Sequence, residues 1–196
     1  LLTHQMPIDY ETDLSFTAPI NWMYAPNYTR SNLPYMLLYT EKRLGGSTLP
    51  SLDKSTQIKY PYRTVNFDSN LSNALVIYMP QNGCLRVMDP NRGHAEIYDN
   101  IADEFTQAIA ISDPSRILVK STPPAKPMFF PEPAKDWCYY FATVELYNQW
   151  NEYQVSAEFA DEALAANFTP EDPREWTVFI EAYAMNGEVE KAITAS

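Results

Sequence analysis

The chain has 196 residues, enough for one sizeable domain or two small ones, and 45% of them are hydrophobic, so a packed core is expected. The formal net charge of −11 arises in the last third: residues 136–196 hold 12 acidic and 2 basic side chains, whereas residues 1–135 hold 13 and 12. Nucleic acid is not an expected partner, because phosphate binding needs clustered cations. A membrane span is not expected either, because no apolar run approaches roughly 18–20 residues.

The first third of the chain has weak signals. Residues 1–8 predict a strand, and residues 15–26 form an aromatic, irregular stretch. A helix is expected over residues 32–44, because Asn32 suits an N-cap and two glycines follow at 45–46. The chain starts without an initiator methionine or signal peptide, which indicates a fragment of a longer protein.

The clearest local signal in the first 120 residues is a hairpin. Residues 74–79 predict a buried strand, residues 80–83 (PQNG) a turn, and residues 84–88 a return strand, since Asn-Gly is a frequent hairpin dipeptide. Before it, residues 58–67 are rich in Tyr, Val and Thr and predict a strand interrupted near Pro61.

The middle of the chain ends in a proline-rich stretch. A helix capped by Asp99 or Asn100 is expected to run to Ile111, followed by a short strand at 117–119. Residues 121–133 contain five prolines, which excludes a helix or a central strand and predicts an extended connector.

Residues 136–196 predict two successive helical hairpins. Apolar residues recur at helical spacing in four segments. Their members are Trp137, Tyr140, Phe141, Val144 and Tyr147; Val155, Phe159, Ala160 and Ala163; Trp176, Phe179, Ile180 and Tyr183; and Val189, Ala192 and Ile193. The third helix has a start signal, with Asp172 as N-cap, Pro173 in the first turn and Glu175 reaching back as in a capping box. The alternative is a helical bundle whose aromatic residues fill a core.

The two hairpins are similar to each other at an offset of 36 residues. The offset aligns Tyr140 with Trp176, Val144 with Ile180, Tyr147 with Tyr183, and Ser156 with Ala192. The period, the aromatic first helix and the alanine-rich second helix resemble tetratricopeptide repeats, although the usual glycine of the first helix is missing. The predicted class is therefore α+β: a small mixed α/β layer in residues 1–120, a connector in 121–135, and two tetratricopeptide-like hairpins in 136–196.

No catalytic, cofactor or metal motif stands out. The chain lacks a metalloprotease motif, a nucleophile elbow and a glycine-rich phosphate loop. The segment Asp89–Gly93 is similar to a calcium loop but lacks the ligands that such a loop requires, so a turn is expected. We therefore expect no catalytic residue, no cofactor and no metal in this chain.

Two surfaces are candidates for binding. The aromatic residues Trp22, Tyr24, Tyr28, Tyr35 and Tyr39 lie close in sequence beside amide and guanidinium side chains, a combination that suits sugar rings. The acidic residues Glu145, Glu152, Glu158, Asp161 and Glu162 are candidates for a face that docks a protein partner. The simpler interpretations are that the aromatic residues belong to a core and that the acids are solvated.

The two cysteines, Cys84 and Cys138, do not form a C-x-x-C pair, so neither zinc binding nor thioredoxin-like chemistry is expected. They form one disulfide if the domain lies outside the cytoplasm, and remain buried thiols in a reducing compartment.

Several segments together resemble one family. They are Asp13–Trp22, Tyr24–Pro26, Pro34–Met36, Arg43–Gly46, Cys84–Pro90, Trp137–Phe141 and Phe179–Ala184. They resemble the soluble C-terminal region of multi-pass membrane proteins from filamentous, Chloroflexi-type bacteria, which look like polyprenyl-phosphate-sugar glycosyltransferases related to protein mannosyltransferases. The resemblance covers nearly the whole chain.

The resemblance implies a position at the extracytoplasmic face of a bacterial membrane, as part of a longer membrane protein, and so favours the disulfide. It carries no catalytic residue, because the catalytic carboxylate of such transferases lies in an early loop between membrane helices. The expected function is non-catalytic docking of a protein partner or of the parent's membrane domain. The alternative is a glycan-binding module that presents acceptor sugar.

Overall fold

The structure is a computed structural model, and it describes residues 1–4, 13–40, 49, 51–98, 101–117 and 134–196. It confirms the α+β class. The chain divides into a sheet unit, Leu1–Tyr78 with Val87–Glu132, and a helical unit, Met79–Arg86 with Pro133–Ser196. The predicted domains assigned residues 79–86 to the first part of the chain, whereas this inserted loop belongs to the helical unit. None of the described helices has the length and apolarity needed to cross a membrane.

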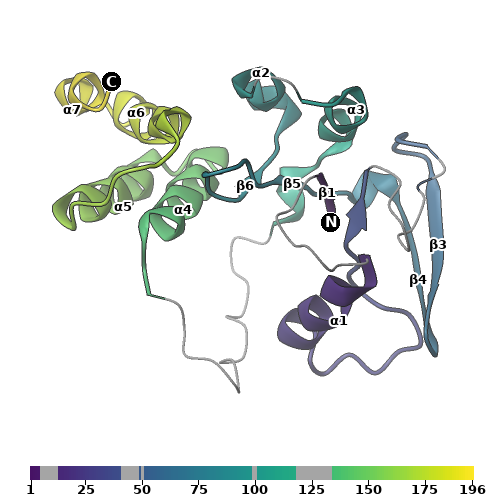
Figure 1. Cartoon of the computed structure of the whole chain (residues 1–196). Coiled ribbons are helices and arrows are strands. Elements are labelled where there is room, and N and C mark those ends of the chain that lie inside the picture. Colours follow the sequence, from purple (N-terminus) through teal and green to yellow (C-terminus); the bar gives the residue numbers. More distant parts are fainter. Residues whose placement is uncertain (5–12, 41–48, 50, 99–100, 118–133) are drawn as a thin grey trace. The chain divides into compact units, whose positions relative to one another are not determined.

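The sheet unit is organised around a small sheet in the order β2-β1-β5-β6 (Figure 1). The strands are β1 (Leu2–His4), β2 (Leu38–Tyr39), β5 (Val76–Tyr78) and β6 (Arg86–Val87). β1 pairs with both β2 and β5 in parallel. Strands paired in parallel are usually buried on both faces, and the paired residues Leu2, Thr3, Leu38, Tyr39, Val76 and Ile77 are all buried here.

One helix covers this sheet and completes its core. α3 (Asp103–Ile111) packs on β1 and β5 and buries Phe105, Ala108 and Ile109. Ser112, which ends the helix, accepts a hydrogen bond at Oγ from the Val76 N–H at 3.0 Å. The helix therefore begins later than the predicted cap at Asp99 or Asn100, and those two positions lie outside the described residues. A short helix, α2 (His94–Ile97), precedes it.

The predicted helix over residues 32–44 is wrong. Residues 36–39 are a buried apolar run that ends in strand β2, and residues 41–44 lie outside the described part. An apolar run this short has no periodicity that separates a strand from a helix. The N-terminal helix is instead α1 (Asp13–Tyr24), in the stretch predicted to be irregular, and it contains Pro19.

The strand predicted over residues 58–67 is present as parts of two strands, because the chain reverses at residues 63–64 and is not interrupted near Pro61. β3 (Gln57–Tyr62) and β4 (Val65–Asn70) form a separate antiparallel pair, which Figure 1 shows as a two-stranded ribbon. Arg63 adopts φ 54°, as a tight two-residue turn requires. The predicted strand at 117–119 and the proline-rich connector lie almost entirely outside the described residues.

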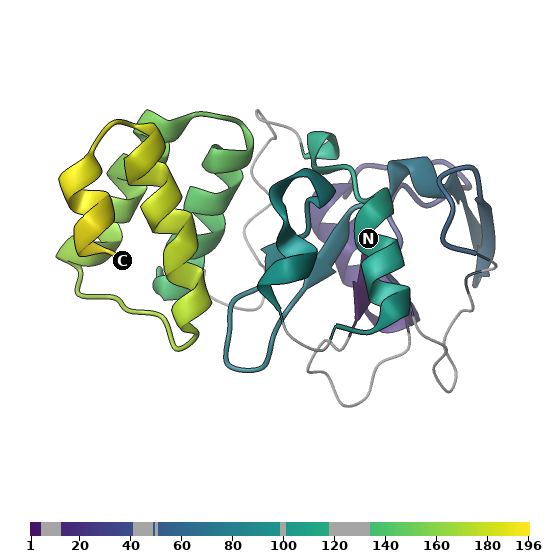
Figure 2. The same cartoon turned by 90° about the horizontal axis from the view of Figure 1, so that it is seen from above.

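The helical unit contains four α-helices in two hairpins (Figures 1 and 2). α4 (Trp137–Gln149) packs against α5 (Tyr153–Ala165), and α6 (Trp176–Met185) packs against α7 (Val189–Thr194). α6 also contacts both helices of the first hairpin. This is the packing expected when successive helical hairpins stack and bury a continuous core.

The 36-residue offset holds in the backbone as well as in the sequence. Asn151 and Gly187 occupy equivalent turns, and both have positive φ, 59° and 83°. The next residue in each hairpin, Glu152 or Glu188, donates its N–H to the carbonyl of Tyr147 (2.9 Å) or Tyr183 (2.8 Å). Equivalent aspartates, 136 and 172, cap the first helical turn of each hairpin. The two hairpins are therefore structural repeats.

Candidate functional site

Four of the five aromatic residues predicted to bind glycan are exposed: Trp22, Tyr24, Tyr28 and Tyr35. They come from the end of α1 and from the segment that follows it. Tyr39 does not belong with them, because it lies in β2 and is only 1% exposed. The prediction that Tyr39 contributes to glycan binding is therefore corrected, because residues 38–39 pair with β1 and lie inside the sheet.

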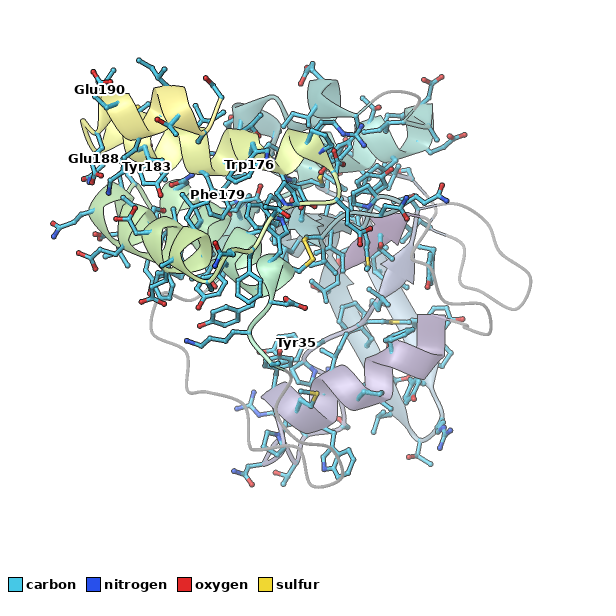
Figure 3. All side chains as sticks on the ribbon, turned by 60° about the vertical axis from the view of Figure 1, so that its left-hand side comes forward. Tyr35, Trp176, Phe179, Tyr183, Glu188 and Glu190 are labelled. Atoms are coloured by element: carbon cyan, nitrogen blue, oxygen red, sulfur yellow. A yellow bond between two sulfur atoms is a disulfide. The ribbon has the colours of Figure 1, made fainter. Side chains whose placement is uncertain are left out.

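A pair of exposed hydrogen bonds fixes the backbone at Tyr35, which is part of this aromatic surface. The Asn21 side chain donates to the Tyr35 carbonyl at 2.7 Å and accepts from the Tyr35 N–H at 3.1 Å. The Leu37 N–H donates to Thr17 Oγ1 on the same helix. Figure 3 shows Tyr35 beside α1, where these bonds hold it. The Asn21 amide therefore ties the backbone of Tyr35 to helix α1, which carries Trp22 and Tyr24.

The predicted acidic face is correct in exposure for four of its residues, Glu152, Glu158, Asp161 and Glu162. Glu145 is a correction, because it is only 4% exposed. Its Oε1 lies 2.6 Å from Nε of Arg86, which is itself buried and stacks over Phe141, with Cζ 4.9 Å from the ring centroid. Burying an unpaired carboxylate costs free energy of folding, and the Arg86 cation from the inserted loop offsets this cost at Glu145.

The inserted loop is held in the helical unit by covalent and polar contacts. Cys84 forms a disulfide with Cys138 on α4, with the two Cα atoms 5.1 Å apart. The predicted turn at 80–83 is present, with the Gly83 N–H donating to the Pro80 carbonyl at 3.2 Å. A Cβ atom at Gly83 would lie 2.6 Å from Pro80 Cγ and 3.1 Å from Glu175 Oε1, so close packing requires glycine here.

Glu175 receives the loop and does not form the predicted capping box. Its carboxylate accepts hydrogen bonds from the Cys84 N–H and from the Trp137 indole N–H, and the residue is 1% exposed. Burial raises the pKa of this carboxyl above its ordinary value, against the opposing effect of the two hydrogen bonds. The sequence pattern was misleading because a glutamate three residues after the N-cap can either complete a capping box or, as here, accept hydrogen bonds from a distant segment.

Asp172 does have the predicted capping role. Its side chain accepts from the Arg174 N–H at 3.0 Å and pairs with the Arg174 guanidinium at 2.8 Å. Burial acts to raise the pKa of Asp172, but the bonds from Arg174 together outweigh it and hold the pKa below its ordinary value. The pKa values of these two carboxyl groups, three residues apart, are thus shifted in opposite directions.

The second hairpin leaves large apolar side chains in solvent. Met185 of α6 is 59% exposed, and Val189 and Ile193 of α7 are 58% and 62% exposed. Val189 and Ile193 are four residues apart, so they lie on one face of α7. We call these three residues the end face. Sequence periodicity assigned Val189 and Ile193 to a core because it cannot show whether a neighbouring helix is there to cover them.

A groove of about 520 Å³ lies beside α7. Its lining comes from α5, α6 and α7 and from the residues after α7: Leu164, Trp176, Tyr183, Glu190, Lys191, Thr194, Ala195 and Ser196. Lys191 donates to both Asp161 oxygens at 2.9 and 2.7 Å, and the Tyr183 hydroxyl donates to Asp161 at 2.9 Å. Figure 3 shows Trp176, Phe179 and Tyr183 in order along α6, with Glu188 and Glu190 on the adjacent hairpin end.

Among the described residues, no group of three or more His, Cys, Asp or Glu side chains has a geometry that would hold a metal ion. The segment at 89–93 is a turn in which Asp89 accepts from the Asn91 N–H at 2.8 Å.

Comparisons with protein-family models, with curated proteins and with solved structures find no match for this chain. The resemblance to membrane glycosyltransferases therefore stays a prediction.

The disulfide leads to a first prediction. Protein purified without reductant should have neither cysteine available for alkylation, and reduction should release both. The bond spans 54 residues of sequence, so the double variant Cys84→Ala with Cys138→Ala should lose about 2–4 kcal/mol of unfolding free energy in the helical unit. Urea denaturation followed by tryptophan fluorescence measures this loss. Two alkylatable thiols in native, unreduced protein would contradict the pairing.

The two shifted carboxyls lead to a second prediction, on pH. Glu175→Gln should cost about 1–3 kcal/mol in acid, because the buried hydrogen bonds change. The raised pKa of Glu175 means that ionisation destabilises the folded state as pH rises from about 4.5 through that pKa, so this cost should shrink with rising pH. The lowered pKa of Asp172 gives stability that is present above about 3.8 and is lost as pH falls through the folded pKa.

Asp172→Asn should therefore cost most at neutral pH and least in acid, opposite to the trend for Glu175→Gln. Urea titrations of the wild type and both variants between about pH 3 and pH 7 measure the two trends. Parallel trends would show that the assigned environments are wrong.

Proposed function

We propose that this chain is a non-catalytic docking module that holds a protein partner through its second helical hairpin. The observation that carries the proposal is the end face, where Met185, Val189 and Ile193 are each more than half exposed, whereas Tyr139 and Leu164 of the first hairpin are 38% exposed. Exposed apolar residues that cluster beside polar ones are typical of interaction surfaces.

The charge of the helical unit supports the same function. Glu158, Glu162 and Glu190 are exposed on α5 and α7, and Lys191 is engaged with Asp161 and Glu188. Such a surface attracts a basic partner and speeds its association, an effect that weakens with salt. In this proposal the acidic surface orients the approaching partner, and the burial of the apolar end face contributes the binding free energy.

The proposed setting is the extracytoplasmic face of a bacterial membrane, where the chain is attached to a glycosyltransferase-like membrane protein. The resemblance described above is the main argument. The Cys84–Cys138 disulfide supports it, because such bonds persist in oxidising compartments and are rare in the cytosol. In this proposal, any transferase reaction takes place in the membrane protein, and this chain recruits or positions a partner.

A third prediction tests the docking function. The double variant Val189→Ser with Ile193→Ser removes apolar area without adding charge, and both side chains are exposed, so unfolding free energy should change by no more than about 0.5 kcal/mol. The immobilised 196-residue chain should enrich specific proteins from membrane extracts of the source organism, and the variant should lose them at least about tenfold. Quantitative mass spectrometry measures the enrichment.

The matched control for this test is Ala142→Ser, an exposed position on α4. It should recover the same proteins as the wild type. Equal recovery by the wild type and the end-face variant would refute docking through this hairpin.

A second candidate function is carbohydrate binding by the sheet unit. The observation that favours it is the exposure of Trp22, Tyr24, Tyr28 and Tyr35, since such large rings are normally covered when they serve a core. The Asn21 amide holds Tyr35 in place beside α1, so ring positions are partly set before a ligand arrives.

A fourth prediction tests this candidate. If the rings stack on sugar, Trp22→Ala should weaken binding to a soluble oligosaccharide selected on a glycan array by roughly tenfold, as the loss of an aromatic anchor does in other interfaces. Isothermal titration measures the affinity, and Tyr139→Ala, an exposed aromatic of the helical unit, is the control. Binding that Trp22→Ala leaves unchanged would dismiss the sugar-binding function.

A further inference from the structure

The two cysteines of the Cys84–Cys138 disulfide differ in exposure. Cys138 lies in the first turn of α4 and is exposed, whereas Cys84 of the inserted loop is only 2% exposed. Thiol–disulfide exchange begins when an external thiolate attacks one of the two sulfurs, and the rate depends on access to that sulfur. Attack on Cys138 therefore needs less opening of the structure than attack on Cys84, and it makes Cys84 the leaving sulfur.

The leaving sulfur lies beside a buried carboxyl group. Cys84 Sγ is 3.5 Å from Glu175 Oε2, and Glu175 is 1% exposed. The same carboxyl group accepts hydrogen bonds from the Cys84 N–H and from the Trp137 indole N–H. In the disulfide, Cys84 has no sulfur-bound proton to donate, so this contact becomes a hydrogen bond only when Cys84 is a thiol. The helical unit thus holds an acceptor in place for the reduced form of Cys84.

The pKa of the Glu175 carboxyl group is above its ordinary value, and burial is the largest cause. The Cys84 N–H and the Trp137 N–H act to lower this pKa, the Asp172 carboxylate acts to raise it, and the Arg86 cation acts to lower it. The influence of Arg86 is shared, because its Nε lies 2.6 Å from Glu145 of α4. Glu175 therefore keeps its proton to a higher pH than an exposed glutamate does, as a proton donor needs.

We propose that the Cys84–Cys138 disulfide exchanges with small external thiols in the folded chain, with Cys138 as the attacked sulfur and Glu175 as the proton donor to Cys84. This activity is separate from the docking function and does not depend on it. The two sulfurs come from a loop and a helix, 54 residues apart in sequence, and not from the single turn of a C-x-x-C pair. The bond is then a reversible link between the inserted loop and α4.

The exchange transfers two electrons from the external thiol to the disulfide. The thiolate sulfur bonds to Cys138 Sγ, and the Cys84–Cys138 bond breaks with its electron pair on Cys84 Sγ. Cys84 Sγ takes the proton of Glu175, which leaves a carboxylate with three donors: the S–H and N–H of Cys84 and the N–H of Trp137. A second thiolate then displaces Cys138, which takes a proton from water, and the two external sulfurs leave as a disulfide.

The fifth prediction identifies the attacked sulfur. The native 196-residue chain is treated with reduced glutathione, quenched in acid, and labelled in urea with excess N-ethylmaleimide. Peptide mass spectrometry of the mixed disulfides should find glutathione on Cys138 and maleimide on Cys84, at least about tenfold more often than the opposite arrangement, because Cys138 is the accessible residue.

Three results of this experiment would overturn the inference. The first is glutathione mainly on Cys84 or equally on both cysteines. The second is a native chain that forms no mixed disulfide. The third is reduction at the rate of unfolding, independent of glutathione concentration, since the disulfide would then react only in the unfolded chain.

A second measurement tests Glu175 as the proton donor. The rate constant of exchange per glutathione thiolate is compared for the wild type and Glu175→Gln between about pH 5 and pH 8. The wild-type rate constant should fall at least about tenfold as pH rises through the raised pKa of Glu175, because the carboxyl group loses the proton that it donates. The Glu175→Gln rate constant should be lower in acid and nearly independent of pH.

The matched control is Glu158→Gln, an exposed glutamate of α5, which should keep the wild-type dependence on pH. A merely structural effect of Glu175→Gln would change the rate constant without changing how it varies with pH. The same pH dependence in the wild type and in Glu175→Gln would overturn the role of Glu175. The identity of the attacked sulfur is measured on the wild type, so it does not depend on the folding of any variant.

Discussion

The helical unit depends on one buried arrangement, the capture of the inserted loop by two carboxylates and a disulfide. Glu175 accepts the Cys84 N–H, Glu145 pairs with Arg86, and Cys84 is bonded to Cys138. Each buried charge would be costly alone, because a carboxylate without a partner loses its hydration. The loop supplies the donors and the helices supply the acceptors, so neither is complete without the other. The first hairpin and the start of the second are thereby fixed around a segment that is distant in sequence.

The same unit is closed at one end and open at the other. The first hairpin has the loop and its disulfide on α4, and α6 covers α5. The second hairpin ends in α7, whose outer stripe exposes Val189 and Ile193. Stacked repeats bury their faces against neighbouring repeats. Among the described residues the outer stripe of α7 is apolar and exposed, which is why the proposed docking function is assigned to it rather than to the buried carboxylates.

The charged residues illustrate what a sequence pattern conceals. Glu145, Glu158 and Glu162 look alike in sequence, yet only Glu145 is buried, because Arg86 from the inserted loop reaches it. Likewise, Glu175 fits a capping box, but its carboxylate is engaged by Cys84 and Trp137. Both differences depend on partners 38, 59 or 91 positions away along the chain. Among the aromatic residues, Tyr39 was misplaced for the same reason, since its burial follows from pairing with β1.

The sequence by itself determined the four helices of residues 136–196, the cap at Asp172, the turn at 80–83 and the 36-residue repeat. These features depend on interactions within a few residues, such as helical periodicity, capping and a left-handed turn residue. Only the tertiary structure decided that residues 36–39 are a strand, that the loop at 79–86 belongs to the helices, and that Val189 and Ile193 are uncovered. These features depend on which segments meet in space, and local propensity carries no information about a neighbour that is distant in the chain.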